Sequence, residues 1–384
     1  MDFSLSDEQR FIRDTIEKFL ARECGREVVK KLDEERRFPT DLYRTVAGMG
    51  FCGLTIPEEY GGGGPNVLGA ALVTEELATV SPVLAGAFSA AAFRGGLTLS
   101  TLGSDAQKKA LLPKLAEGAH LFSFAVEEPG LTGGAGPFRT QAERRDEVFV
   151  VSGVKSCAGL ADHADYLIVP VSTEAIDGDE NSVTIFLVQT GSGNIRITPA
   201  ETVGFVSGSF CDVVFDDLVL TREDILGGGE HIGRGRVQME GIAACANLEI
   251  AAIARGIMKG CYEYALNYAK EREQFGQAIM RFGGVQDMLV EMAVSVRVAG
   301  DLLYRACWCA DRGDPYLEES TMARLRACRD VRQAAMDCMQ VLGGYGYANE
   351  YDAQRYLRDS LVMLEGTPGT GVLKDTLADC LWAY

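Results

Sequence analysis

This sequence lacks the usual metal-binding and nucleotide-binding patterns. Its candidate functional groups are therefore individual charged side chains. Only three histidines occur, scattered at His120, His163 and His231. The 11 cysteines include no CxxC pair, so we do not expect a zinc site. The sequence also lacks a Walker-A loop and a GxGxxG motif that leads from a strand into a helix.

The net charge limits what those side chains can bind. With 37 Lys and Arg residues against 55 Asp and Glu residues, the formal charge is −18. Nucleic acids and anionic membranes require clustered cations, so both are excluded as main partners. A phosphate-bearing small molecule needs only one or two arginines or a helix N-terminus, and it is compatible with this charge.

The first part of the chain, residues 1–122, is expected to be helical. Residues 6–9 form a capping box, in which Ser and Gln side chains satisfy free backbone groups at a helix start. Apolar residues then recur at helical spacing over 12–20, and a second such start occurs at 104–107. Between them, four consecutive glycines at 61–64 form a loop that no helix can cross.

The remaining two parts predict a mainly α fold with a central β domain. Over 123–231, short β-branched runs separated by Gly, Asp, Asn and Ser predict a small antiparallel barrel or sandwich. Over 232–384 the pattern is helical again, and 237–273 contains no proline. A helix that long predicts a C-terminal four-helix bundle, with partners at 284–312 and 317–342.

Three further expectations follow from composition. Surplus apolar residues at 250–257 suggest a second buried face and an oligomer, although a central bundle helix would look similar. The polar start is unlike a signal peptide, and the apolar stretches carry charges or break before about 18 residues, so we expect no membrane span. Unclustered cysteines are typical of reduced thiols, which points to the cytoplasm.

Seven short motifs, in one order along nearly the whole chain, resemble those of the acyl-CoA dehydrogenase family. Each is weak alone, but the set with family-like spacing identifies the chain as similar to that family. The motifs are Pro57-Glu58-Glu59-Tyr60-Gly61-Gly62, Glu128-Pro129-Gly130, Cys211-Asp212-Val213-Val214-Phe215-Asp216-Asp217, Tyr268-Ala269-Lys270-Glu271-Arg272-Glu273-Gln274-Phe275-Gly276, Gln340-Val341-Leu342-Gly343-Gly344-Tyr345-Gly346, Arg355-Tyr356-Leu357-Arg358-Asp359 and Glu365-Gly366-Thr367.

The resemblance implies FAD as cofactor, an acyl-CoA thioester as substrate and an electron-transfer flavoprotein as acceptor. A carboxylate removes the proton beside the thioester carbonyl while hydride leaves the β-carbon, so base and acceptor must flank one C–C bond in a dry slot. By motif the base is Glu365, which otherwise could be a carboxylate favoured by a helix dipole. Thr367 would contact the cofactor. An acyl group on a carrier protein instead of CoA is also compatible.

The resemblance further implies a tetramer, homomeric or heteromeric, in which subunits share the cofactor. Arg272 would pair with pyrophosphate, and Phe275 would reach the FAD of a neighbour. Gln340 with Gly343 and Gly344 would allow close approach to the adenosine end. Without the resemblance, Arg272 would be a surface ion-pair residue, Phe275 a core residue and the glycines a helix C-cap.

The loops expected to face the flavin depart from the family pattern. Glu127 and Gly133 stand where the family has Thr and Ser, Cys157 replaces a Trp and Gly159 replaces a Thr. Losing an aromatic surface and several neutral hydrogen bonds, each about 1 kcal/mol, could weaken cofactor affinity by several decades. The residues that would contact a neighbouring subunit match the family pattern better than these loops do.

The expected substrate side also departs from the pattern. Asn247 stands where the family often presents an Arg, and Leu364 stands where a Tyr often precedes the base. Arg94 lies in a segment that lines the acyl slot in relatives. It could pair with a carboxylate at the far end of a dicarboxylyl-CoA, or it could form a structural ion pair.

Three hypotheses about function result. The chain could be a flavoenzyme that desaturates an acyl thioester. It could instead be a flavin-degenerate partner subunit that completes the FAD site of a sister chain. It could also be a non-redox hydratase or lyase on the same scaffold, with Glu365 still removing an α-proton.

Overall fold

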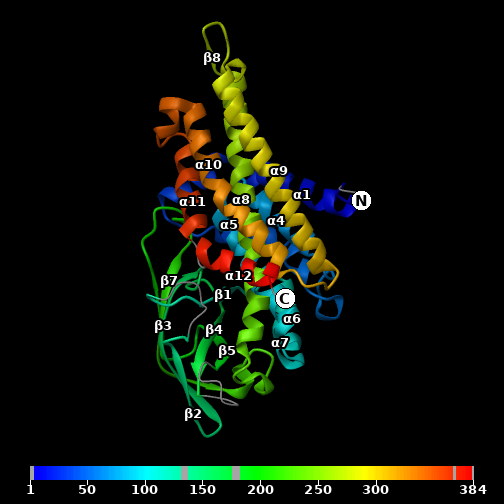
Figure 1. The fold of residues 1–384 in the computed structure, drawn as a ribbon, viewed down its shortest axis with the longest axis vertical. Coiled ribbons are helices and arrows are strands. Elements are labelled where there is room, and N and C mark those ends of the chain that lie inside the picture. The colour runs from blue at the N-terminus through cyan, green and yellow to red at the C-terminus, as the bar shows by residue number, and fades with distance from the viewer. Residues whose placement is uncertain (1–3, 131–136, 175–181, 366–368, 383–384) are drawn as a thin grey trace.

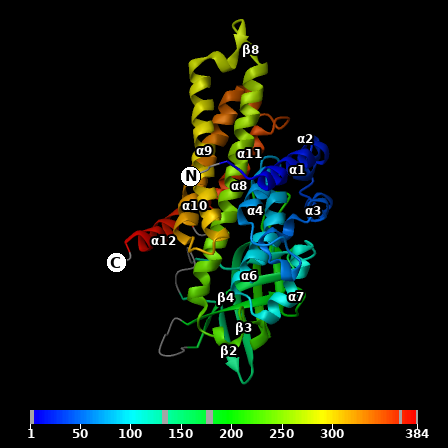
Figure 2. The same cartoon turned by 90° about the vertical axis from the view of Figure 1, so that its right-hand side faces the viewer.

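The computed structural model describes residues 4–130, 137–174, 182–365 and 369–382, and for residues 364 and 365 it describes the backbone alone. The strands of the seven-stranded sheet gather at one end of the molecule, and long helices run from them to the opposite end (Figure 1). The N-terminal helices lie along one side of this body (Figure 2).

The N-terminal part is built from helices, with one longer connection over residues 48–66 that contains two short 3-10 segments and the four glycines. The capping boxes predicted at Ser6 and Ser104 both form, and each begins a helix. After α5 the chain continues in a π-helical segment, Ala90–Leu97, which we call the π segment. The helices are α1 (Asp7–Glu23), α2 (Arg26–Glu34), α3 (Thr40–Ala47), α4 (Val67–Ala78), α5 (Pro82–Ser89), α6 (Thr98–Leu102) and α7 (Asp105–Ala116).

The β domain is one seven-stranded sheet in the order β1-β4-β2-β3-β7-β6, with β5 paired to β4. Pairing is mainly antiparallel, as expected, but β4 pairs in parallel with β1 and, over two residues, with β2. The sequence pattern does not predict β1 or β2, because one is very short and the other is polar. The strands are β1 (Phe122–Phe124), β2 (Gln141–Arg145), β3 (Val148–Gly159), β4 (Tyr166–Thr173), β5 (Val183–Gln189), β6 (Ile195–Pro199) and β7 (Phe210–Thr221).

The C-terminal part is a bundle around one long central helix, as predicted. Beyond this helix a two-stranded hairpin forms the tip of the molecule (Figure 1). The last helix stands away from the body (Figure 2). The elements are α8 (Gly235–Glu271), β8 (Glu273–Gln274), β9 (Gln277–Ala278), α9 (Gly283–Asp311), α10 (Leu317–Leu342), α11 (Ala353–Glu365) and α12 (Thr370–Trp382).

Two helical stretches, Pro82–Leu102 and Gly235–Glu271, are long and apolar enough to cross a membrane by length and composition. In this fold, 89% and 72% of their most apolar windows are buried inside the protein. The apolar surplus around 250–257 therefore reflects the central position of α8, which is the alternative that the sequence left open.

The crossing of α4 and α8 joins the N-terminal part to the bundle. A Cβ at Gly256 would lie 2.3 Å from the Glu75 carbonyl oxygen, and one at Gly260 would lie 2.4 Å from the Thr79 carbonyl oxygen. These two glycines are four residues apart and therefore share one face of α8. Glycine is required at both positions because the α4 backbone lies directly against α8.

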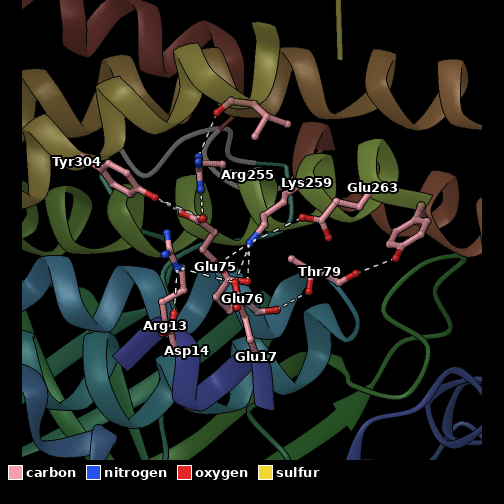
Figure 3. Close-up of polar contacts among 12 residues, drawn as sticks. Arg13, Asp14, Glu17, Glu75, Glu76, Thr79, Arg255, Lys259, Glu263 and Tyr304 are labelled. Carbon is pink, nitrogen blue, oxygen red and sulfur yellow. Dashed lines mark hydrogen bonds and ion pairs between the residues drawn. The ribbon is translucent and has the colours of Figure 1, made fainter. Parts of the chain in front are cut away.

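Buried ion pairs flank this crossing (Figure 3). Arg255 pairs with Glu75, whose carboxylate also accepts a hydrogen bond from the Tyr304 hydroxyl at 3.0 Å. Lys259 donates to both carboxylate oxygens of Glu76, at 2.5 and 2.6 Å. Burial raises the pKa of Glu76, and Lys259 opposes that shift. The crossing thus depends on carboxylates that need their cations.

Replacing Lys259 by Met should lower the free energy of unfolding at pH 8 by about 3 kcal/mol or more, because Glu76 stays buried without a cation. The pKa of Glu76 then rises further, so the folded state takes up a proton and the loss shrinks as pH falls towards 5. Urea unfolding at both pH values measures this.

The exposed pair Arg145–Glu143 offers the control. Arg145→Met should change the free energy of unfolding by less than about 0.5 kcal/mol. A Lys259→Met effect of that small size, or one that does not change with pH, would contradict the conclusion that Lys259 stabilises the buried Glu76 carboxylate.

Candidate active site

A cavity of about 200 Å³ lies where the β domain meets the helices. The π segment, the end of β3, α8, α10 and the end of α11 all contribute to its wall. Most of the lining is apolar, and four charged side chains interrupt it. These are Arg94, Glu127, Glu249 and Arg324.

Arg94 and Glu249 form a buried ion pair in this wall. The Arg94 Nε lies 3.1 and 3.0 Å from the two carboxylate oxygens of Glu249, and Nη2 lies 2.5 Å from Oε1. The other terminal nitrogen, Nη1, donates to the Gly159 carbonyl at 2.8 Å. The side chains are 13% and 3% exposed. The structural ion pair that the sequence allowed for Arg94 is therefore present, and it lies in the cavity wall.

Arg324 adds a second guanidinium, from α10, that is only 1% exposed. Its Nη1 donates to Asn247 Oδ1 at 3.1 Å, and Asn247 Nδ2 donates to Thr321 Oγ1 at 3.0 Å. Burial lowers the pKa of Arg324, and Glu127 and Glu249 are among the groups that oppose this shift. Asn247 thus lies beside the cavity and orients a cation, rather than lining the cavity itself.

A second buried ion pair shapes the β-domain side of the cavity. Lys155 Nζ donates to Glu128 Oε1 at 2.8 Å and to the Val126 carbonyl at 3.1 Å. Burial lowers the pKa of Lys155 to about 8, against the opposing effect of Glu128. The Ser156 amide then donates to the Glu127 carbonyl at 2.8 Å, which ties the two cavity-lining loops together.

β3 changes register between Lys155 and Ala158, and this irregularity turns Cys157 towards the cavity. Cys157 has a φ of 55°, in the left-handed region. At Gly159 a Cβ would lie 3.6 Å from Nη1 of Arg94 and 3.6 Å from the Phe210 ring. Both are ordinary van der Waals distances, so the contact of the guanidinium with the Gly159 carbonyl does not require glycine.

The end of α11 reaches the cavity. Val362 and Met363 line it, and the helix ends at Glu365. Asp359 on the same helix accepts the Phe205 amide at 2.7 Å, which fixes α11 to the loop before β7. The side chains of Leu364 and Glu365 lie outside the described part of the chain, so their predicted roles stay predictions.

The predicted cofactor residues divide into two groups. Glu127, Cys157 and Gly159 line the cavity. Gly133 and Thr367 lie outside the described residues. Arg272, Phe275, Gln340, Gly343 and Gly344 form a separate exposed group near the tip of the molecule.

One aromatic contact joins the Arg272 segment of this tip group to the segment that follows Gly343 and Gly344. The Arg272 guanidinium lies 5.7 Å from the centre of the Tyr345 ring. Gly343 ends α10 with a φ of 60°, so the C-cap that the sequence allowed does form. Phe275 is 95% exposed, which contradicts its interpretation as a core residue. Arg272 is 23 residues beyond Glu249 on α8, about 35 Å along the helix axis.

Two residues of the cavity were missed as candidates by the sequence analysis. Arg324 shares the face of α10 that carries Ala327, Cys328 and Val331, so a cation on an apolar stripe was the available signal. Glu249 gave a similar signal within the most apolar part of α8. That Glu249 faces Arg94, 155 residues away in the chain, was visible only in the structure.

The comparisons with known proteins cover the whole chain. It matches the N-terminal, middle and C-terminal domains of acyl-CoA dehydrogenases over residues 6–119, 123–218 and 233–379. The benzylmalonyl-CoA dehydrogenase of Aromatoleum aromaticum is 33% identical over 98% of this chain and 99% of that protein. A probable acyl-CoA dehydrogenase of Bacillus subtilis is 30% identical over 94% and 95%.

The structural comparison agrees. Butyryl-CoA dehydrogenase from Megasphaera elsdenii matches with a TM-score of 0.93 at 26% identity, over 99% of this chain and 100% of that one. This chain therefore shares the architecture of an acyl-CoA-oxidising enzyme, in which a β domain lies between two helical parts. The chain belongs to the acyl-CoA dehydrogenase family, and the resemblance noted in the sequence is confirmed.

Cys157 should react first with an aromatic disulfide reagent, because it is the one exposed thiol, nine are buried and Cys380 is half-buried. Burial, together with Asp212 and Glu127, raises its pKa, so the rate should continue to increase with pH above the ordinary pKa of a thiol. Stopped-flow labelling measures the fast phase. Cys157→Ser should abolish that phase and Cys380→Ser should keep it; the reverse result would place Cys157 away from solvent.

Proposed function

We propose that this protein is a flavoenzyme that introduces an α,β double bond into an acyl thioester. A carboxylate takes the proton beside the thioester carbonyl, and a hydride leaves the β-carbon. When bound, FAD supplies the hydride acceptor. The observation that carries the proposal is the cavity between the β domain and the helices, with Glu365 ending the helix that lines it.

The residues around the cavity fit a flavin in this chain. Ser156 and Glu127 supply polar groups, and Gly159 has no side chain that would fill the cavity. On the β-domain side of the cavity, Phe124, Val126 and Phe210 add apolar surface, which suits a planar aromatic ring system. We propose that Glu127, Cys157 and Gly159 contact the ring system, and that Gly133 and Thr367 lie near it.

The exposed tip group supports a shared cofactor site. Arg272, the C-cap of α8, is about 35 Å along the helix axis from Glu249, and none of Arg272, Phe275, Gln340, Gly343 and Gly344 lines the cavity. We therefore propose that these five residues contact the cofactor of a neighbouring subunit. Large apolar side chains on the bundle also remain exposed and offer surface for assembly. They are Val290, Val294, Trp308, Met336 and Trp382.

Other parts of the proposal come from the family and from composition. Electrons would pass to an electron-transfer flavoprotein, and the acyl group could be carried by CoA or by a carrier protein. The 11 free thiols support a cytoplasmic location. Arg94 contributes to substrate binding in this proposal, although Glu249 already engages its charge.

The purified protein should be yellow or become yellow with FAD, and its visible band should bleach when an acyl-CoA is added without oxygen. Bound FAD should also protect Cys157 from the disulfide reagent. Glu365→Gln should keep FAD and thioester binding but slow bleaching by about 10²- to 10⁴-fold, because the base is lost. The exposed Glu350→Gln should bleach at the normal rate.

Other outcomes would favour the competing hypotheses. A colourless protein that turns over a thioester without an electron acceptor would indicate a non-redox enzyme. A colourless protein that yields a half-loaded complex with a sister chain would indicate a partner subunit. Normal bleaching by Glu365→Gln would remove Glu365 as the base.

A further inference from the structure

The cavity wall carries balanced charge where an apolar acyl group would need none. Arg94 and Arg324 contribute two positive charges, and Glu127 and Glu249 contribute two negative charges, so the described lining is neutral before Glu365 is counted, whose side chain lies outside the described residues. Buried charges cost free energy unless they are paired. A cavity that bound only a hydrocarbon chain would be more stable with apolar side chains in its wall, because no charge would have to be buried.

The Arg94–Glu249 pair retains hydrogen-bonding capacity towards the cavity. A guanidinium has five N–H groups on three nitrogens, and the contacts with Glu249 and Gly159 use one N–H group on each nitrogen, which leaves two N–H groups. The Glu249 carboxylate accepts only from this guanidinium among the described residues. Both a donor and an acceptor are therefore available to a ligand in one place.

These features limit the ligand group that suits the pair. A methyl group placed there would exclude water and leave polar atoms without partners. A carboxylate would bring a negative charge to a guanidinium whose charge Glu249 already neutralises. A neutral group that both donates and accepts hydrogen bonds avoids both penalties.

We infer that the Arg94–Glu249 pair selects thioesters whose acyl group carries a neutral hydrogen-bonding group, such as a hydroxyl or a carboxamide. The inference rests on the proposed function, since it names the substrate class of the same site. It also replaces the dicarboxylyl-CoA that the sequence suggested, because Glu249 already neutralises Arg94.

Calorimetric binding to the FAD-loaded full chain tests this without requiring turnover. The probes are ω-hydroxyacyl, alkyl and dicarboxylyl thioesters of matched length, offered as CoA and as phosphopantetheine derivatives. The hydroxyacyl compound of best length should bind about 10-fold or more tightly than the alkyl compound with the same number of heavy atoms. It should also bind more tightly than the dicarboxylyl compound.

Two variants address the pair directly. Arg94→Met with Glu249→Leu should remove the hydroxyl preference and bind the alkyl compound at least as well as before. Glu249→Gln leaves the Arg94 charge unbalanced, so it should shift the preference by about 10-fold or more towards the dicarboxylyl compound. This single variant keeps the side-chain volume and provides a readout if the double variant does not fold.

The chain offers a matched control in Arg255 and Glu75, a buried pair of the same residue types that does not line the cavity. Arg255→Met with Glu75→Leu should keep the hydroxyl preference. Equal binding of hydroxyacyl and alkyl compounds by the parent protein would overturn the inference and leave the proposed function standing. If no thioester of any kind binds, the proposed function fails and the inference fails with it.

Discussion

The close crossing of α4 and α8 is the constraint on which the rest of the structure depends. Gly256 and Gly260 bring the two backbones into contact, and the buried pairs beside them tie each helix to the other. Glu249 is seven residues before Gly256, about two turns, so it lies on the same face of α8. That face meets the helices that follow α4, including the π segment with Arg94. The crossing therefore decides where the acyl wall of the cavity lies.

Charge inside this protein is organised differently from charge on its surface. The chain as a whole carries a formal charge of −18, yet among the described residues that line the cavity two arginines balance two glutamates. Surface carboxylates are hydrated and screened, so their excess costs little. In the cavity each carboxylate lies near a guanidinium, because an unpaired charge there would be expensive. A neutral, hydrogen-bonding interior results, and its chemistry differs from that of a purely apolar slot.

The β-domain wall shows how a changed loop can keep its geometry. The Lys155–Glu128 pair holds the strand end and the preceding loop together below the exposed residues. Cys157 and Gly159 are carried on that support, so they can differ from the family pattern without loss of the backbone path. The substitutions change the side chains at these two positions, while the buried pair holds the backbone that carries them.

The sequence alone determined the elements and their order. Capping boxes at Ser6 and Ser104, the β-branched runs and the proline-free segment of α8 act locally, so each was readable from neighbouring residues. The family motifs added candidate residues both in the cavity and in the tip group. Only the tertiary structure decided which charges meet: Arg94 and Glu249 are 155 positions apart, and nothing local to either specifies its partner. It also separated the tip group from the cavity, because a long rigid helix converts sequence distance into spatial distance.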